Sequence, residues 1–336
     1  MKIAMRISFA VIATLFVAGL LSAQAPAAPG EEPKVDTIPV SKLSFKTTKI
    51  NDSLYILTGI APTPVGYNVP NGRFGGQIAV LIGPDGIFMV DAQYPPKEIS
   101  EKVLASIRQF SNAPIRYVVL THFHGDHTGG NDFFAKMGAT IMSSPMLRKR
   151  LAEQKGYPVG GVPTVTYDKP MTIYMNGEVI DLYPMYPSHT DGDTIVRFRN
   201  ADVIMMGDIA RAGYPNGVKM ASGSDNGGLI DAYGMAIGLG SPATKYIPGH
   251  GPFFTRADMI EYRDMLAATR KRIETLKRQE KTADEVLAAH PTADYDDKVL
   301  RSGYGYGDVA SFYDDGTMPR LKNSDIYVKE TYDEVK

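Results

Sequence analysis

The strongest constraint on the fold of this chain is the heptapeptide 121–127, Thr-His-Phe-His-Gly-Asp-His. It follows the apolar run 117–120 (Tyr-Val-Val-Leu), which is typical of a buried strand. Polar side chains at the end of a buried strand are costly unless each has a partner. A bound cation would be that partner, because imidazole and carboxylate groups suit zinc and related divalent metals. A polar loop with clustered histidines is the alternative, but only six histidines occur in the whole chain and three of them are here.

Three more candidate ligands follow short apolar strands elsewhere in the chain: His189, Asp208 and His250. Strands that share one core present their ends together, so these residues can converge with the heptapeptide despite their separation in sequence. Asp193 is expected to cap a turn rather than to bind a metal. His290 lies in the charged C-terminal region and is expected at the surface.

The candidate ligands divide between two ions on geometric grounds. His122 and His124 alternate along an extended segment, so their side chains point the same way. Asp126 and His127 lie beyond Gly125, where the chain can turn and face elsewhere. We therefore expect one ion at His122, His124 and His189, a second at Asp126, His127 and His250, and Asp208 bridging both.

A pair of metal ions in one site indicates hydrolytic chemistry. Two cations that share a water lower its pKa towards neutrality and so provide a hydroxide nucleophile. Three protein ligands per ion leave room for that water, as an open catalytic site requires. Asp126 is expected to be catalytic as well as a ligand.

Four segments carry a resemblance to a known family: 121–127, 188–193 (Ser-His-Thr-Asp-Gly-Asp), 207–208 (Gly-Asp) and 248–251 (Pro-Gly-His-Gly). In order and spacing they resemble the metal motifs of the metallo-β-lactamase superfamily of hydrolases, over about residues 43–255. The resemblance implies an α/β fold, the four-layer αββα sandwich, with two zinc ions at one edge between the sheets. Iron and manganese are alternative metals. Asp91 matches an aspartate of the family, for which we expect a supporting role.

The resemblance also narrows the branch of the family. The chain has no cysteine, which excludes the β-lactamases that use a cysteine ligand. An aspartate at position 208 resembles the glyoxalase II, lactonase and general hydrolase branches, whereas enzymes without a bridging carboxylate place serine nearby. His124 stands where the oxygen-reducing iron variants have glutamate, so those variants do not fit.

The predicted function is an exported dinuclear zinc hydrolase that cleaves an ester-like or amide-like bond in a small molecule. A β-lactam, a lactone and a thioester all remain open as substrates. Hydrolysis of a phosphodiester or sulfate ester by the same two-metal site is the alternative, and a non-catalytic zinc-binding module is a third reading. The net charge of −1 gives no indication of a nucleic-acid partner.

Substrate contacts are expected in two loops. Tyr67 lies in the Pro- and Gly-rich segment 61–76, and Arg211, Tyr214 and Lys219 follow Asp208. Arginine and tyrosine can bind a carboxylate or polarise a carbonyl. Each of these side chains has an equally plausible alternative as a solvated loop residue.

The termini differ from the predicted hydrolase domain, 43–255. Residues 1–25 have the basic start, apolar run and small-residue end of a bacterial-type signal peptide, which predicts a periplasmic or secreted protein. An uncleaved N-terminal membrane anchor is the alternative. Residues 26–42 are expected to be a flexible mature N-terminus, and 256–336 a helical extension ending in a polar tail from His290. The sequence does not indicate the oligomeric state.

The periodicity of apolar residues predicts the main elements of the domain. Segment 43–60 is expected to form two short strands around Asn51-Asp52, and 96–109 a helix. Segment 115–120 is expected to be the strand that delivers the heptapeptide. Segments 256–281 and 282–289 are expected to be helices, the second opening on a capping-box pattern.

Overall fold

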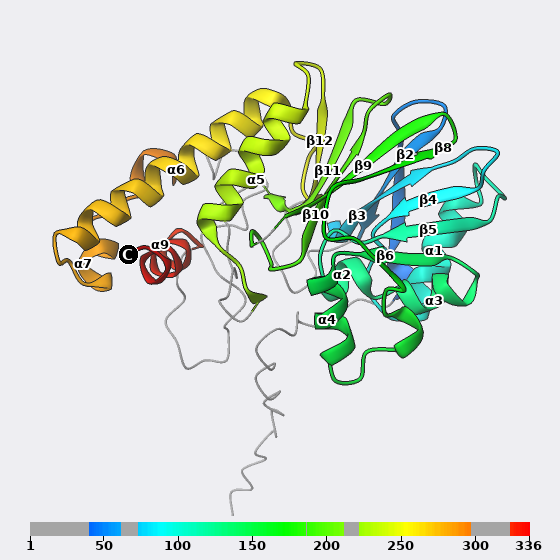
Figure 1. Ribbon diagram of the computed structural model, residues 1–336, viewed down its shortest axis with the longest axis horizontal. Coiled ribbons are helices and arrows are strands. Elements are labelled where there is room, and N and C mark those ends of the chain that lie inside the picture. Colours follow the sequence, from blue (N-terminus) through cyan, green and yellow to red (C-terminus); the bar gives the residue numbers. More distant parts are fainter. Residues whose placement is uncertain (1–39, 62–72, 186, 212–221, 297–322) are drawn as a thin grey trace, which may run out of the picture.

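The computed structural model describes residues 40–61, 73–185, 187–211, 222–296 and 323–336. Two β-sheets lie face to face, and helices lie on their outer sides (Figure 1). The larger sheet has the order β1-β2-β3-β4-β5-β6-β7, antiparallel from β1 to β4 and parallel from β4 to β7. Its strands are β1 (Ser44–Lys49), β2 (Leu54–Ile60), β3 (Arg73–Leu81), β4 (Ile87–Val90), β5 (Ile115–Val119), β6 (Thr140–Ser143) and β7 (Val165–Thr166).

The smaller sheet has the order β12-β11-β10-β9-β8. Its strands are β8 (Met171–Met175), β9 (Glu178–Met185), β10 (Asp193–Phe198), β11 (Val203–Arg211) and β12 (Lys245–His250). Only the β11–β12 pair in this sheet is parallel. Both sheets therefore contain parallel strands whose carboxyl ends can carry functional residues.

Alternation along each strand separates the inner from the outer layers. On β5, Val119 packs into the core between the two sheets, where it meets residues of the smaller sheet such as Val196 and Ile247. Its neighbours Val118 and Leu120 face the opposite side and pack against helices. Because successive side chains of a strand point to opposite faces, the end of β5 that is buried on both faces, from Val118 onwards, is apolar.

Helices cover the outer face of each sheet and complete the four-layer αββα sandwich predicted from the sequence. The helices packed on the larger sheet are α1 (Lys97–Ile107), α3 (Asn131–Lys136) and α4 (Pro145–Glu153). Those on the smaller sheet are α5 (Asn226–Leu239) and α6 (Arg256–Arg278). The remaining helical segments are η1 (Val40–Lys42), α2 (Gly125–Thr128), η2 (Val159–Gly161), α7 (Ala283–Ala288) and α9 (Asn323–Glu334).

The expected elements occur close to their predicted positions. The two strands of segment 43–60, the helix at 96–109 and the strand at 115–120 correspond to β1, β2, α1 and β5. The expected capping box is present at α7, where Thr282 and Glu285 exchange hydrogen bonds with each other's backbone N–H.

The C-terminal region differs from the expected polar tail. Residues 323–334 form α9, which packs on α6 and α7 at the end of the chain (Figure 1). Ile326, Tyr327 and Val328 are buried although they lie in a polar sequence. Only three consecutive apolar residues mark this helix, which is too short a run to give a helical period.

Residues 1–25 and most of the predicted flexible segment lie outside the described residues, and the last three residues of that segment, 40–42, form η1. Within the described ranges, no helix combines the length and apolar character that a bilayer span requires. The domain boundary at residue 255 stays a prediction.

Candidate metal centre

The heptapeptide changes direction at Gly125. β5 ends at Val119, and His124, with φ and ψ of −61° and 149°, has the extended conformation of an N-cap residue. The helical turn α2 then begins at Gly125 and carries Asp126 and His127. The two halves of the motif therefore reach the site from different backbone conformations.

Three other segments deliver the remaining candidates. His189 lies in the loop between β9 and β10, Asp208 lies within β11, and His250 is the last residue of β12. The sequence placed Asp208 after its strand, whereas β11 continues to Arg211 through register irregularities on either side of Gly207. Gly207 has φ +50°, in the left-handed region. This conformation changes the direction of β11 immediately before Asp208.

Asp193 caps the turn that holds His189, as the sequence predicts. Its carboxylate accepts hydrogen bonds from the Thr190 backbone N–H at 2.8 Å and from the Ser188 and Thr190 hydroxyls, each at 2.5 Å. Burial raises the pKa of Asp193 to about 7 although these hydrogen bonds favour the charged form.

The structure brings all seven predicted metal ligands together. Their ligand atoms form three overlapping groups, in each of which the atoms lie within 4.8 Å of one another. The groups are His122, His124, His189 and Asp208; His122, Asp126 and His127; and His127, Asp208 and His250. The first group holds the three histidines assigned to one ion, together with Asp208. His122 also approaches the second set, a proximity that the sequence did not indicate.

Asp208 lies between the two sets of histidines. Its Oδ1 is 3.3 Å from Nε2 of His127 and 3.4 Å from Nε2 of His250. Its Oδ2 is 3.7 Å from Nε2 of His189, on the other side. Asp126 belongs to the His250 side, where its Oδ2 is 2.9 Å from Nε2 of that histidine.

Several of these buried atoms have no hydrogen-bond partner. They are His122 Nε2, Asp126 Oδ1, His127 Nε2 and Asp208 Oδ1. Buried polar atoms without partners are rare, since each costs free energy on folding. Converging imidazole nitrogens and carboxylate oxygens fit a divalent metal, commonly zinc, which would give all of them one shared partner.

Charge at the centre favours a cation. Burial holds the pKa values of His122 and His189 well below the usual range and lowers that of His124 to about 4, so these rings are neutral and offer lone pairs. For Asp126, neighbouring His127 and His250 outweigh burial and hold the pKa well below the usual range.

His127 shows the opposite shift. Burial would lower the pKa of this imidazole, but the carboxylates of Asp126, Asp91 and Asp208 outweigh it and raise the pKa well above the usual range. Carboxylates that favour a proton on this ring favour a metal cation at the same place.

Asp91 has the supporting role that the resemblance implied, and together with Thr121 it fixes two of the rings. Nδ1 of His127 is 2.7 Å from Oδ2 of Asp91, and Nδ1 of His122 is 3.1 Å from the Thr121 hydroxyl. Thr121 in turn donates to Asp91 through its backbone N–H and its hydroxyl, at 2.7 and 2.8 Å. With Nδ1 of each ring occupied, Nε2 is the nitrogen left for a metal.

Two further residues shape the centre without being candidate ligands, and the sequence analysis missed the first. The buried side-chain amide of Gln77 donates to the carbonyl oxygens of Pro248 and Gly251, at 2.9 and 3.2 Å, on either side of His250. Gly249 approaches so closely that a Cβ there would lie 1.9 Å from Oδ1 of Asp208. A lone glutamine on a strand gives no sequence signal for such a contact.

The four predicted substrate contacts have different outcomes. Tyr67, Tyr214 and Lys219 lie outside the described residues. Arg211 ends β11 and is only 7% exposed, so it is not a solvated loop side chain. Its positive charge contributes to the lowered pKa values of His124 and His189, and its backbone pairs with that of His250 across β11 and β12.

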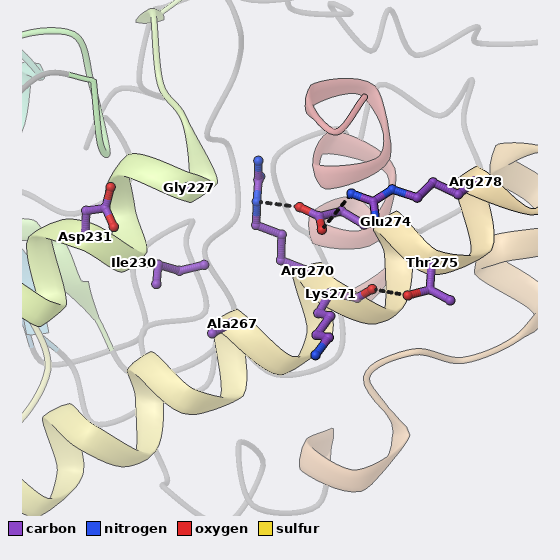
Figure 2. Close-up of a pocket in the computed structure, with 9 residues that line it drawn as sticks. All are labelled: Gly227, Ile230, Asp231, Ala267, Arg270, Lys271, Glu274, Thr275 and Arg278. Carbon is purple, nitrogen blue, oxygen red and sulfur yellow. Dashed lines mark hydrogen bonds and ion pairs between the residues drawn. The ribbon is translucent and has the colours of Figure 1, made fainter.

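A pocket of about 390 Å³ lies between α5 and α6, and none of the candidate ligands lines it. Figure 2 shows Glu274 paired with two of its basic side chains, Arg270 and Arg278. The pocket therefore lacks the donor set of the metal centre.

Comparison with known proteins agrees with this fold and site. Residues 72–250 match the family model described as the metallo-beta-lactamase superfamily. A metallo-beta-lactamase type 2 of Elizabethkingia meningoseptica is 22% identical over 169 residues, which cover 50% of this chain and 63% of that protein. The chain thus matches less than two thirds of the length of this curated relative.

Solved structures show the same fold. A metallo-beta-lactamase from Pontibacter korlensis aligns with a TM-score of 0.57 and 20% identity, over 67% of this chain and 99% of that one. The DIM-1 metallo-beta-lactamase aligns with a TM-score of 0.53 and 18% identity, over 67% and 97%. Since the family model spans more than half of the 336 residues and the motifs it covers converge on one site, the chain belongs to the metallo-beta-lactamase superfamily.

Proposed function

We propose that this protein is a hydrolase that uses two divalent ions, both zinc. His122, His124 and His189 hold one ion, and Asp126, His127 and His250 hold the other. Iron and manganese are the alternative metals, because nitrogen and oxygen ligands without a thiolate accept them as well.

The observation that carries this proposal is the orientation of Asp208. Its two carboxylate oxygens face different histidines, Oδ1 towards His127 and His250 and Oδ2 towards His189. A carboxylate in this position suits a bridge between two ions. A bridging Asp208 supports assignment to the glyoxalase II-like branch or to a β-lactamase-like relative of it.

Two bound divalent ions supply an activated water near neutral pH and polarise the bond that is cut. Asp126 contributes a second function in this proposal. Its pKa is well below the usual range, so it is a carboxylate at neutral pH; its Oδ2 lies 2.9 Å from Nε2 of His250, and its buried Oδ1 has no hydrogen-bond donor. Such a group accepts a hydrogen bond from a water molecule and so orients that water for attack.

We propose an ester-like or amide-like bond in a small molecule as the target: a β-lactam, a lactone or a thioester. The matched relatives are named as β-lactamases, which supports a β-lactam, whereas a bridging aspartate supports a lactone or a thioester. Arg211, buried at the end of β11 and with a charge that lowers the pKa values of His124 and His189, is the described residue that we propose to contact a substrate carboxylate.

The experiment is a substrate panel with metal analysis. The purified protein is analysed for metal content and assayed with a chromogenic cephalosporin, an acyl-homoserine lactone and S-lactoylglutathione, before and after a chelator. Turnover of one compound, abolished by the chelator and restored by zinc, is expected with two equivalents of metal. Faster turnover of bis(p-nitrophenyl) phosphate than of any carbonyl compound would favour phosphodiester hydrolysis instead. Tight metal binding without turnover of any compound would favour a binding module.

Export to the periplasm or the medium is part of the same proposal and rests on the signal-peptide pattern of residues 1–25. Fractionation of cells that express the full chain, with N-terminal sequencing of the product, tests both export and cleavage. An uncleaved product in the membrane fraction would indicate the N-terminal anchor instead.

A further inference from the structure

Arg150 connects the two loops that carry His124 and His189. Its guanidinium donates to both carboxylate oxygens of Asp191, from Nε at 3.1 and 3.2 Å and from Nη2 at 2.7 Å. Asp191 lies two residues after His189. The same guanidinium lies over the Phe123 ring, 5.4 Å from its centroid, and Phe123 directly precedes His124.

These contacts continue to the candidate ligands. The Phe123 ring meets the His124 ring edge to face, with centroids 4.7 Å apart. His124 then meets His189 across the two loops, with Nδ1 of the first 3.1 Å from Nε2 of the second. Arg150 is therefore linked to His124 through Phe123 and to the His189 loop through Asp191, and the two histidines contact each other.

The helix that carries Arg150 is firmly placed. Leu147 and Leu151 of α4 are buried in the core beneath the larger sheet. The N-cap residue Ser144 donates from its hydroxyl to the carbonyl oxygen of Gly192, at 2.7 Å, on the loop that contains Asp191. α4 thus gives Arg150 a rigid base from which to fix the loop.

We propose that Arg150 is a positioning residue that holds the His124 and His189 loops at ligand distance, and so sets the affinity of the ion bound by His122, His124 and His189. This inference rests on the proposed two-ion site. The planar guanidinium is suited to the task, because it grips a carboxylate with two parallel hydrogen bonds while it stacks on an aromatic ring.

Charge alone predicts the opposite effect. A guanidinium near a cation site repels the cation and neutralises Asp191, so its removal would strengthen metal binding if Arg150 acted only through its charge. Positioning predicts that its removal weakens metal binding, because the two histidines lose their common support. The sign of the change therefore separates the two roles.

The test compares zinc affinity in Arg150→Met, Arg150→Lys and the wild type, each as the full chain stripped of metal and titrated against a chromophoric competitor. Residues that support metal ligands typically alter affinity on the order of 10- to 100-fold. We expect Arg150→Met to weaken one of the two zinc-binding steps by at least about tenfold, with the other step little changed. Arg150→Lys keeps the charge but cannot form the two parallel hydrogen bonds to Asp191, so we expect an intermediate loss of zinc affinity.

Arg148 provides the matched control. It lies on the same helix and donates from Nε to the carbonyl oxygen of Pro163 at 3.0 Å, on a segment with no candidate ligand. Arg148→Met removes the same charge and is expected to keep both zinc affinities. Cobalt(II) titration gives a second readout. The visible absorption of the cobalt ion at His122, His124 and His189 should change in Arg150→Met and not in Arg148→Met.

The outcomes are distinct. Unchanged or tighter zinc binding by Arg150→Met, or an equal loss in Arg148→Met, overturns the positioning role. If Arg150→Met does not fold, as judged by thermal unfolding of the metal-free protein, Arg150→Lys decides by the same criterion. A wild-type protein that binds no zinc would overturn the two-ion proposal itself, whereas normal wild-type binding with insensitive variants would overturn only this inference.

Discussion

Oδ2 of Asp91 lies 2.7 Å from Nδ1 of His127, and the other oxygen of the same carboxylate accepts the Thr121 backbone N–H. This arrangement holds the His127 ring with Nδ1 towards Asp91 and turns Nε2 towards Asp126 and Asp208. Asp91 itself has φ +66°, a conformation that non-glycine residues seldom adopt. Strained backbone of this kind persists where the surrounding contacts over-determine it.

Asp91→Asn should therefore weaken metal binding although the side chain keeps its size. Asparagine offers one acceptor oxygen to two Thr121 donors, and its amide would face Nδ1 and favour the wrong tautomer of His127. Loss of such a partner typically lowers metal affinity about 10- to 100-fold. A competition titration with a chromophoric chelator measures the change. Wild-type zinc affinity in Asp91→Asn would show that the His127 tautomer does not depend on Asp91.

Gly249→Ala should disrupt the centre by displacing Asp208. The added Cβ would lie 1.9 Å from Oδ1 of Asp208, far inside van der Waals contact, so either the carboxylate or the β12 end must move. We expect loss of at least one zinc equivalent, measured by metal analysis after dialysis. Gly125→Ala is the matched substitution, since a Cβ at Gly125 meets nothing within 4 Å. Two zinc equivalents in Gly249→Ala would contradict this steric account.

Gln77→Leu should affect the His250 side of the centre. The change removes the two amide donors to Pro248 and Gly251, and leaving a buried acceptor unsatisfied costs about 1–3 kcal/mol. We expect a lower melting temperature, measured by calorimetry, and weaker binding of the ion assigned to His250, measured by zinc titration. Thr58→Val removes only the hydroxyl that donates to Oε1 of Gln77, at 3.0 Å, and should change zinc binding little. Equal effects of the two variants would argue against a specific role for the amide donors.

The meeting of the candidate ligands was predictable from sequence because each lies at or near the end of a short apolar strand, and strand ends in one core meet. The turn at Gly125 was also predictable, whereas the division of the ligands between two ions stays a prediction. The fold class followed from the same strands and from the family motifs.

The contacts of Gln77 and Arg150 were not predictable. Gln77 reaches Pro248 in β12, 171 positions away, and Arg150 reaches Asp191 across 41, so both contacts depend on how the layers pack. Neither residue type is unusual in its local sequence. α9 was missed for a related reason, because its burial depends on contact with α5 and α6 and its own pattern is weak.

The contact of α9 with the first turn of α5 should contribute measurably to stability. Oε2 of Glu334 accepts the backbone N–H of Asn226 at 2.9 Å and pairs with Arg270 at 3.2 Å. That N–H is one of the donors at a helix start that have no partner within the helix. Burial raises the pKa of Glu334, so the fold disfavours its charge while it uses its oxygen as an acceptor.

Glu334→Ala should therefore destabilise the protein by about 1–3 kcal/mol, because the N–H of Asn226 loses its acceptor. Glu334→Gln keeps an acceptor oxygen and gives up only the partly exposed ion pair with Arg270, so a smaller loss is expected. Asp333→Ala, on the exposed face of the same helix, is the control and should change stability little. Urea unfolding of the three variants against the wild type measures the differences. An equal loss in Glu334→Ala and Asp333→Ala would mean that α9 is held by its apolar face, through Tyr327 and Val328, and not by this contact.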